Sequence, residues 1–145
     1  PLYFSPLGSI SRYNDMRAVV DSARLKVLID TVNLTMPYMV FHPKDFINEV
    51  FDELGEHITA LHAKDVKIAG AGLGRVPKTE KGVALIHVDE VPPGDGVLDY
   101  ATILQRLNQL DQDITIHVEH FNYEDTIAGQ QYIRSVARKV SVKLK

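Results

Sequence analysis

The chain has 145 residues, enough for about one domain with a buried core. Charged residues make up 24% of the sequence and the formal net charge is −3, so we expect no basic surface for nucleic acid. The absence of cysteine excludes disulfides and thiolate metal ligands, which leaves His, Asp, Glu and Asn side chains to hold any metal. No apolar run approaches the roughly 20 residues needed to span a bilayer, so we expect a soluble, cytoplasmic protein without membrane association.

Predicted helices and strands alternate along the chain. The helical segments carry apolar residues on one face, and the strand segments are short and apolar. In chain order the expected elements are helix 11–22, strand 25–30, helix 43–54, strand 58–63, helix 99–110, strand 114–119 and helix 124–140. Strands that alternate with helices in this way predict an α/β fold with a parallel sheet.

A long polar segment, residues 65–96, interrupts this alternation. It is rich in glycine and proline, with GAGLGR at 70–75 and VPPGDG at 91–96, and we interpret it as a loop that begins at Asp65. The GAGLGR run does not open an apolar helix, so a flexible loop is favoured over a phosphate-binding turn. Loops of this length are often functional.

Potential metal ligands stand at the ends of three predicted strands: Asp30, His62 and Glu119. In parallel α/β folds the carboxyl ends of the strands are where ligands bind. One Asp, one His and one Glu form a mixed oxygen and nitrogen site suited to one divalent cation, such as Mn²⁺, Mg²⁺, Co²⁺ or Zn²⁺. Each residue alone could instead cap a helix or pair with a lysine, and that reading stays open here.

Other polar side chains near these strand ends are weaker candidates. Strand alternation places Lys64 on the same face as His62, and His117 on the same face as Glu119. The same alternation turns His120 away from the site, unless the strand has already ended.

Four segments carry a family resemblance through their order and spacing: LKVLIDTVN, LHAKDVKI, HVDEVPPGDGVLDY and IHVEHFNYED. They resemble the C-terminal half of the sugar isomerase/epimerase superfamily, the xylose-isomerase-like TIM barrels, which includes ketose 3-epimerases and AP endonucleases. The resemblance implies one domain over residues 1–145 that holds the sixth, seventh and eighth strands of a (β/α)₈ barrel. Because a whole barrel takes about 250 residues, we expect a fragment of a longer protein or a second chain that supplies the rest.

The resemblance also implies a ligand set and a reaction. Asp30, His62 and Glu119 match three of the family's four metal ligands, and the fourth, a glutamate of the fifth strand, is expected upstream of Pro1. The implied activity is isomerisation or epimerisation of a sugar, polyol or sugar phosphate by proton transfer next to a carbonyl, with Glu119 as a catalytic acid/base. The implied substrate contacts are Asn33, Lys64, Lys67 and His87. The 145 residues alone are expected to be inactive and to associate with another copy or with the missing half.

Two differences from the AP endonucleases weigh against a DNA-cleaving activity for this chain. The AP endonucleases carry a histidine three residues after the sixth-strand aspartate, where this chain has Asn33, and an aspartate where it has Leu85. Because this chain lacks both of these zinc ligands, a cluster of several zinc ions is disfavoured. A zinc phosphodiesterase and a non-catalytic ligand-binding relative nevertheless stay as alternatives.

Overall fold

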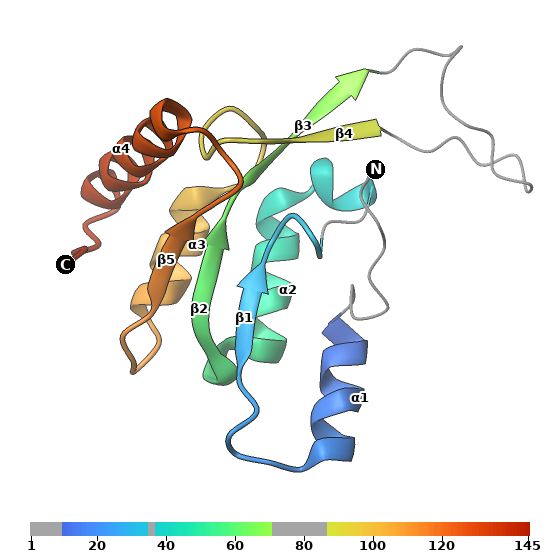
Figure 1. Cartoon of the computed structure of the whole chain (residues 1–145). Coiled ribbons are helices and arrows are strands. Elements are labelled where there is room, and N and C mark those ends of the chain that lie inside the picture. The colour runs from blue at the N-terminus through green and yellow to red at the C-terminus, as the bar shows by residue number, and fades with distance from the viewer. Residues whose placement is uncertain (1–9, 35–36, 71–86) are drawn as a thin grey trace, which may run out of the picture.

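The computed structural model describes residues 10–34, 37–70 and 87–145 of the chain. Its centre is a three-stranded parallel sheet with the order β1–β2–β5, formed by Val27–Asp30, Ile58–Ala63 and Thr115–Val118. The three strands lie side by side with helices packed behind them (Figure 1). The predicted mixed α/β structure with a parallel sheet is therefore confirmed.

The register of the sheet places polar residues in one row near its carboxyl end. Asp30 is aligned with His62 on the neighbouring strand, and His62 with His117 on the next. The row before it, which contains Ile29 and Leu61, is buried at 0% and 1% exposure. Since side chains alternate between the two faces, the sheet has one face buried under helices and one face that carries the polar row.

The described residues form four α-helices behind and beside the sheet: α1 (Ile10–Val20), α2 (Pro43–Leu54), α3 (Tyr100–Asn108) and α4 (Tyr123–Lys139). Short 3₁₀ turns at Pro37–Val40 and Gly55–His57 flank α2. The predicted helix and strand ends agree with these bounds to within two residues. The side chains of Asp99 and Asn122 cap α3 and α4 by accepting hydrogen bonds from the backbone N–H groups of Thr102 and Asp125.

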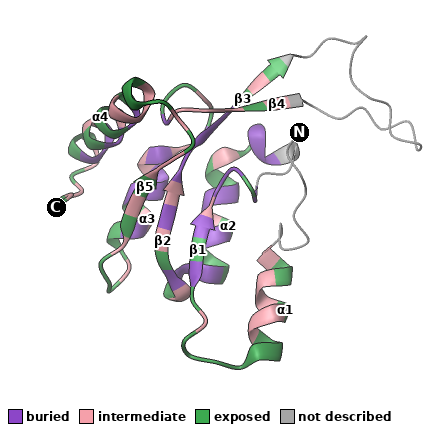
Figure 2. Cartoon of the chain, viewed as in Figure 1, coloured by how far each residue is buried: buried purple, intermediate pink, exposed green. Residues whose placement is uncertain are grey.

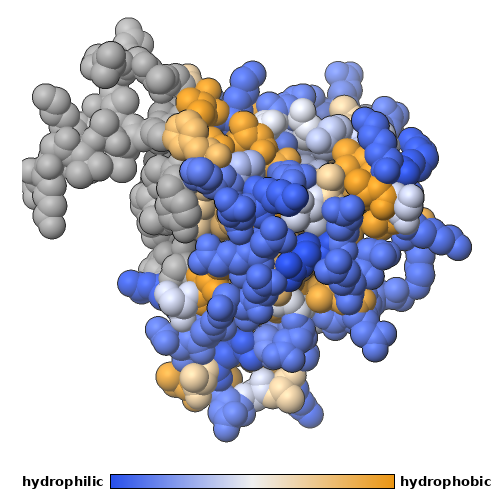
Figure 3. All heavy atoms as spheres, turned by 180° about the vertical axis from the view of Figure 1, so that it is seen from behind, coloured by the Kyte–Doolittle hydropathy of each residue, from blue (hydrophilic) through white to orange (hydrophobic). Residues whose placement is uncertain are grey.

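The core lies between the sheet and helices α2 and α3. Phe46 and Ile47 of α2, together with Ile103 and Leu104 of α3, are at most 1% exposed. Figure 2 shows these buried stripes on the sides of the helices that face the strands. Seen from behind the view of Figure 1, on the side where the helices lie, the surface is largely hydrophilic with small, separate hydrophobic patches (Figure 3). Among the described residues, no helix is long and apolar enough to cross a membrane.

The predicted loop over residues 65–96 is wrong for residues 65–70 and 87–91, whereas residues 92–96 form the expected turn. Asp65–Gly70 forms strand β3, which pairs antiparallel with β4 (His87–Val91) as a two-stranded ribbon. The ribbon extends beyond the carboxyl ends of the parallel strands (Figure 1). Most of the GAGLGR segment and residues 83–86 lie outside the described residues.

Candidate metal centre

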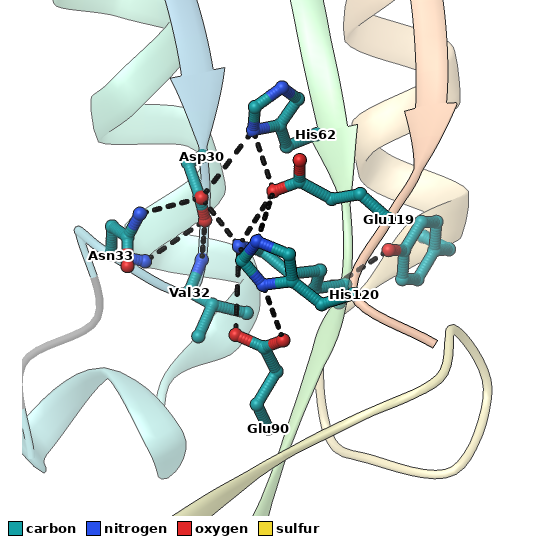
Figure 4. A network of polar contacts seen from close by, with 9 residues as sticks. Asp30, Val32, Asn33, His62, Glu90, Glu119 and His120 are labelled. Atoms are coloured by element: carbon teal, nitrogen blue, oxygen red, sulfur yellow. Dashed lines mark hydrogen bonds and ion pairs between the residues drawn. The ribbon is translucent and has the colours of Figure 1, made fainter. Parts of the chain in front are cut away.

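Three side chains from three strands meet at the carboxyl end of the sheet. Asp30, His62 and Glu119 each offer one ligand atom, and these atoms all lie within 4.8 Å of one another. His62 Nδ1 is 2.8 Å from Glu119 Oε1 and 3.7 Å from Asp30 Oδ2. Figure 4 shows the imidazole and the two carboxylates pointing toward one another. The three predicted ligands are thus brought together.

The sheet itself produces this convergence. Asp30 is the last residue of β1 and is aligned with His62, so the two side chains leave the same face of neighbouring strands. Glu119 follows the last residue of β5, two positions after His117, and its side chain therefore lies on the same face of the sheet as that of His117. The exposed His117 ring makes an edge contact with the His62 ring, at 6.1 Å between the ring centroids.

The Asp30 carboxylate is held in one orientation by the turn that follows β1. Its Oδ1 accepts hydrogen bonds from the backbone N–H groups of Val32 and Asn33, both at 3.1 Å. Its Oδ2 accepts a third from the Asn33 side-chain amide at 2.6 Å. Asn33, a predicted substrate contact, thus lies beside the site and orients a ligand; its contact with substrate stays a prediction.

Lys64 is the most deeply buried charged residue of the site. Its side chain is 1% exposed, and its ammonium lies 2.8 Å from Asp30 Oδ2 and 2.9 Å from Glu119 Oε1. Burial alone would lower the pKa of Lys64, but the hydrogen bonds to these two carboxylates raise it above its ordinary value. Lys64 is therefore a permanent positive charge between two of the candidate ligands.

Glu119 is the ligand with the most cationic surroundings. Partial burial raises its pKa, but the hydrogen bond and charge of Lys64 lower it more, with further lowering from His62 and His120. The net pKa lies below the ordinary value, so this carboxylate is ionised at neutral pH. An ionised carboxylate can bind a cation or accept a proton.

Sequence reasoning missed Glu90 and His120. The strand β5 ends at Val118, and His120 has a positive φ of 71° that turns its ring back toward the site. Its Nδ1 lies 2.9 Å from Glu90 Oε1, and its Nε2 lies 3.6 Å from Glu119 Oε1. Glu90 arrives from β4, and its Oε2 is 3.5 Å from the Lys64 ammonium. Glu90 could not be found while residues 65–96 were interpreted as a loop, and His120 was directed away from the site except on the condition, met here, that the strand had already ended.

Asp65 and Tyr100 hold the backbone around Lys64. Asp65 does not open a loop: it is the buried first residue of β3, and it accepts hydrogen bonds from the backbone N–H groups of Val66, Gly94 and Leu98. Burial raises its pKa, and those hydrogen bonds partly offset the rise. The Tyr100 hydroxyl donates to the Lys64 carbonyl at 2.8 Å, and burial raises its pKa well above 10.

Two predicted substrate contacts belong to the β3–β4 ribbon. Lys67 is exposed on β3 and is aligned with Asp89 of β4. His87 is the first residue of β4 and pairs with Gly70 through the backbone, but its side chain lies outside the described part of the chain. Their roles stay predictions.

The fold and site define an α/β protein in which carboxylate and imidazole groups that could hold a metal ion meet at the strand ends. A family model described as xylose isomerase-like TIM barrel matches residues 1–138, and the chain belongs to that family. The family includes sugar isomerases and epimerases as well as AP endonucleases. No curated protein matches the chain. The suspected superfamily is confirmed.

The three side chains fit a divalent cation by their donor chemistry. Two carboxylate oxygens and one imidazole nitrogen suit Mn²⁺, Co²⁺ or Zn²⁺, and the oxygen donors also suit Mg²⁺. Hydrogen bonds from Val32 and Asn33 fix one carboxylate, which is the kind of outer support that metal ligands need. Asp30, His62 and Glu119 therefore form a possible metal-binding triad.

Proposed function

We propose that Asp30, His62 and Glu119 hold one divalent cation, and that the chain forms part of the active site of a sugar isomerase or epimerase. The observation that carries the proposal is that three separate strands bring one donor atom each within 4.8 Å at the carboxyl end of the sheet. Membership in a family that includes such enzymes supports it. The proposal includes a fourth ligand, a glutamate from another barrel strand.

The proposed reaction moves a proton at the carbon next to the carbonyl of a ketose or a ketose phosphate. When bound, the cation would polarise the substrate carbonyl as a Lewis acid. Glu119 accepts or returns the proton, because its lowered pKa keeps it ionised at neutral pH. In the metal-free site, His62 and Lys64 hold its Oε1 at 2.8 and 2.9 Å, which places the carboxylate at the carboxyl end of the sheet before a cation binds.

The charges around the site favour a neutral group at the reacting end of the substrate. Three carboxylates, those of Asp30, Glu90 and Glu119, lie within 3.5 Å of the single Lys64 ammonium. Without a metal, a phosphate placed among them would meet like charges, whereas sugar hydroxyls can donate hydrogen bonds to them. A bound divalent cation would offset two of these three negative charges, so this preference belongs to the side chains alone.

An AP-endonuclease-like phosphodiesterase is supported less well. Within the part of the chain that the structure describes, one group of three residues could hold a metal, whereas that chemistry needs a cluster of zinc ions. Asn33, at the position of a further zinc ligand in those relatives, uses its amide to hold Asp30. More than one tightly bound zinc per complete barrel would favour the phosphodiesterase.

The test is the Glu119→Gln variant, made in the complete barrel and assayed with Mn²⁺. Unphosphorylated ketopentoses and ketohexoses in D₂O serve as probes, and NMR follows deuterium incorporation next to the carbonyl. We expect exchange in the wild type, and a loss of at least about 100-fold in E119Q because the base is gone. Glu124→Gln, an exposed residue of α4, is the matched control.

Retention of both metal content and exchange in E119Q would refute the role given to Glu119. Metal binding without any exchange in the wild type would favour the non-catalytic relative.

A further inference from the structure

The Lys64 ammonium and the candidate metal would share ligands. Lys64 Nζ contacts Asp30 Oδ2 and Glu119 Oε1 at 2.8 and 2.9 Å. The same two oxygens lie 3.7 and 2.8 Å from His62 Nδ1, the third candidate ligand. A cation bound by Asp30, His62 and Glu119 would therefore sit beside the ammonium on common oxygen atoms.

This arrangement has opposite consequences with and without a metal. In the metal-free protein the ammonium offsets the repulsion between the carboxylates of Asp30 and Glu119. Once a divalent cation binds the same oxygens, ammonium and cation repel each other across the shared carboxylates. Because the Lys64 side chain is 1% exposed, its charge cannot turn into water and needs another acceptor within the protein.

Glu90 is the carboxylate that can take this role, because His120 Nδ1, which lies 3.4 Å from the ammonium, already faces Glu90 Oε1 at 2.9 Å. Its Oε2 lies 3.5 Å from the Lys64 ammonium, longer than the contacts to Asp30 and Glu119 but within reach of a small side-chain movement. Its other oxygen, Oε1, lies 2.9 Å from His120 Nδ1, which fixes the carboxylate in place. Glu90 comes from the β3–β4 ribbon, and it is not one of the three candidate ligands.

We propose that Lys64 is the resident cation of the metal-free site, and that a divalent cation displaces its ammonium from Asp30 and Glu119 toward Glu90. Glu90 is then a positioning residue of the metal-loaded state. The proposal rests on the metal centre proposed above. It predicts that Lys64 and Glu90 change metal affinity in opposite directions.

The experiment titrates the metal-free complete barrel with Mn²⁺ and measures the free ion by electron paramagnetic resonance. Lys64→Met removes the competing charge at similar volume, and we expect Mn²⁺ to bind about tenfold more tightly. Glu90→Gln removes the acceptor, and we expect about tenfold weaker binding. Two exposed positions, Lys26→Met and Glu49→Gln, repeat the same chemical changes away from the site and should leave the affinity unchanged.

Melting of the metal-free protein gives an independent readout. Without Lys64 the carboxylates of Asp30 and Glu119 repel each other, so K64M should have a lower Tm than the wild type before metal is added. Mn²⁺ should then raise its Tm by more than it raises that of the wild type, because tighter binding gives a larger stabilisation. Lys64→Arg keeps the charge and should bind Mn²⁺ no more tightly than the wild type.

The double variant K64M/E90Q shows whether Glu90 acts by accepting the displaced Lys64 ammonium or by attracting the cation with its own charge. If Glu90 acts through Lys64, the E90Q effect disappears in the K64M background. An E90Q effect of the same size in both backgrounds overturns the proposal, as does unchanged or tighter binding in E90Q alone. If K64M does not fold, the E90Q and K64R titrations still decide.

The underlying metal centre is tested separately by His62→Ala. If H62A loses Mn²⁺ binding and K64M binds Mn²⁺ no more tightly than the wild type, the metal centre is supported and the displacement of Lys64 is refuted. If H62A still binds Mn²⁺, both the metal centre and the displacement of Lys64 are refuted.

Discussion

At the scale of single residues, Asn33 controls how the Asp30 carboxylate presents itself. Its backbone and side-chain N–H groups donate to both oxygens of Asp30, and the side-chain contact is 2.6 Å. A ligand held in this way loses no rotational freedom when a cation binds. Asn33 therefore acts as an outer support for the candidate metal.

Asn33→Ala is expected to weaken Mn²⁺ binding about tenfold, the lower end of the usual effect of losing such a support. The Asp30 carboxylate keeps its backbone hydrogen bonds in this variant, so the fold should persist. The measurement is a Mn²⁺ titration of N33A against Asn14→Ala, which removes an amide that bonds Glu53 on α2. Equal affinities in the two variants would contradict the supporting role.

The ligands and their partners differ in how far they can be predicted from sequence. Asp30, His62 and Glu119 follow from strand alternation, because each stands at or just beyond the end of a short apolar strand. His120 breaks that alternation, since a positive φ of 71° reverses its direction. Backbone reversals in non-glycine residues leave no periodic trace in a sequence.

At the scale of elements, the β3–β4 ribbon shapes one side of the site. It supplies Glu90, and its first residue, Asp65, fixes the turn that follows β4 by accepting from the N–H groups of Gly94 and Leu98. Gly96 belongs to the same turn, where a Cβ atom would collide with the Asp65 carboxylate. The ribbon and the turn are therefore joined through one buried side chain.

Asp65→Ala should lower the free energy of unfolding by about 2 kcal/mol, measured by urea denaturation. Three backbone N–H groups lose their acceptor, but removing a buried charge whose pKa is raised by burial recovers part of the cost. Asp95→Ala, an exposed position in the same turn, should change stability by less than about 0.5 kcal/mol. Equal losses in both variants would contradict the anchoring role of Asp65.

The helices can be predicted from the sequence more readily than the β3–β4 ribbon. Helix α2 shows a one-face apolar pattern with Pro43 at its start, and the capping side chains of Asp99 and Asn122 mark α3 and α4. Such signals are local. Strands β3 and β4 are stabilised by pairing with each other across a long intervening segment rich in glycine and proline, and the polar–apolar alternation over residues 65–68 is too short to predict a strand beside that segment.

At the scale of the whole molecule, the described residues provide three parallel strands, and a closed barrel of this family has eight. The polar row of the sheet lies on the face opposite the α2–α3 core, which is the interior face in a barrel. A groove beside β5 is lined by Ile116, Val118 and Ile133, among others. Association with a second copy or with further barrel strands, as expected from the sequence, stays a prediction.

The central claim is that Asp30, His62 and Glu119 bind one divalent cation. The most direct measurement is an anomalous difference map from crystals grown with Mn²⁺. The account predicts one strong peak per chain, about 2.0–2.3 Å from one oxygen of Asp30, one nitrogen of His62 and one oxygen of Glu119. A map with no peak between these three residues, under conditions where Mn²⁺ binds elsewhere on the chain, would contradict it.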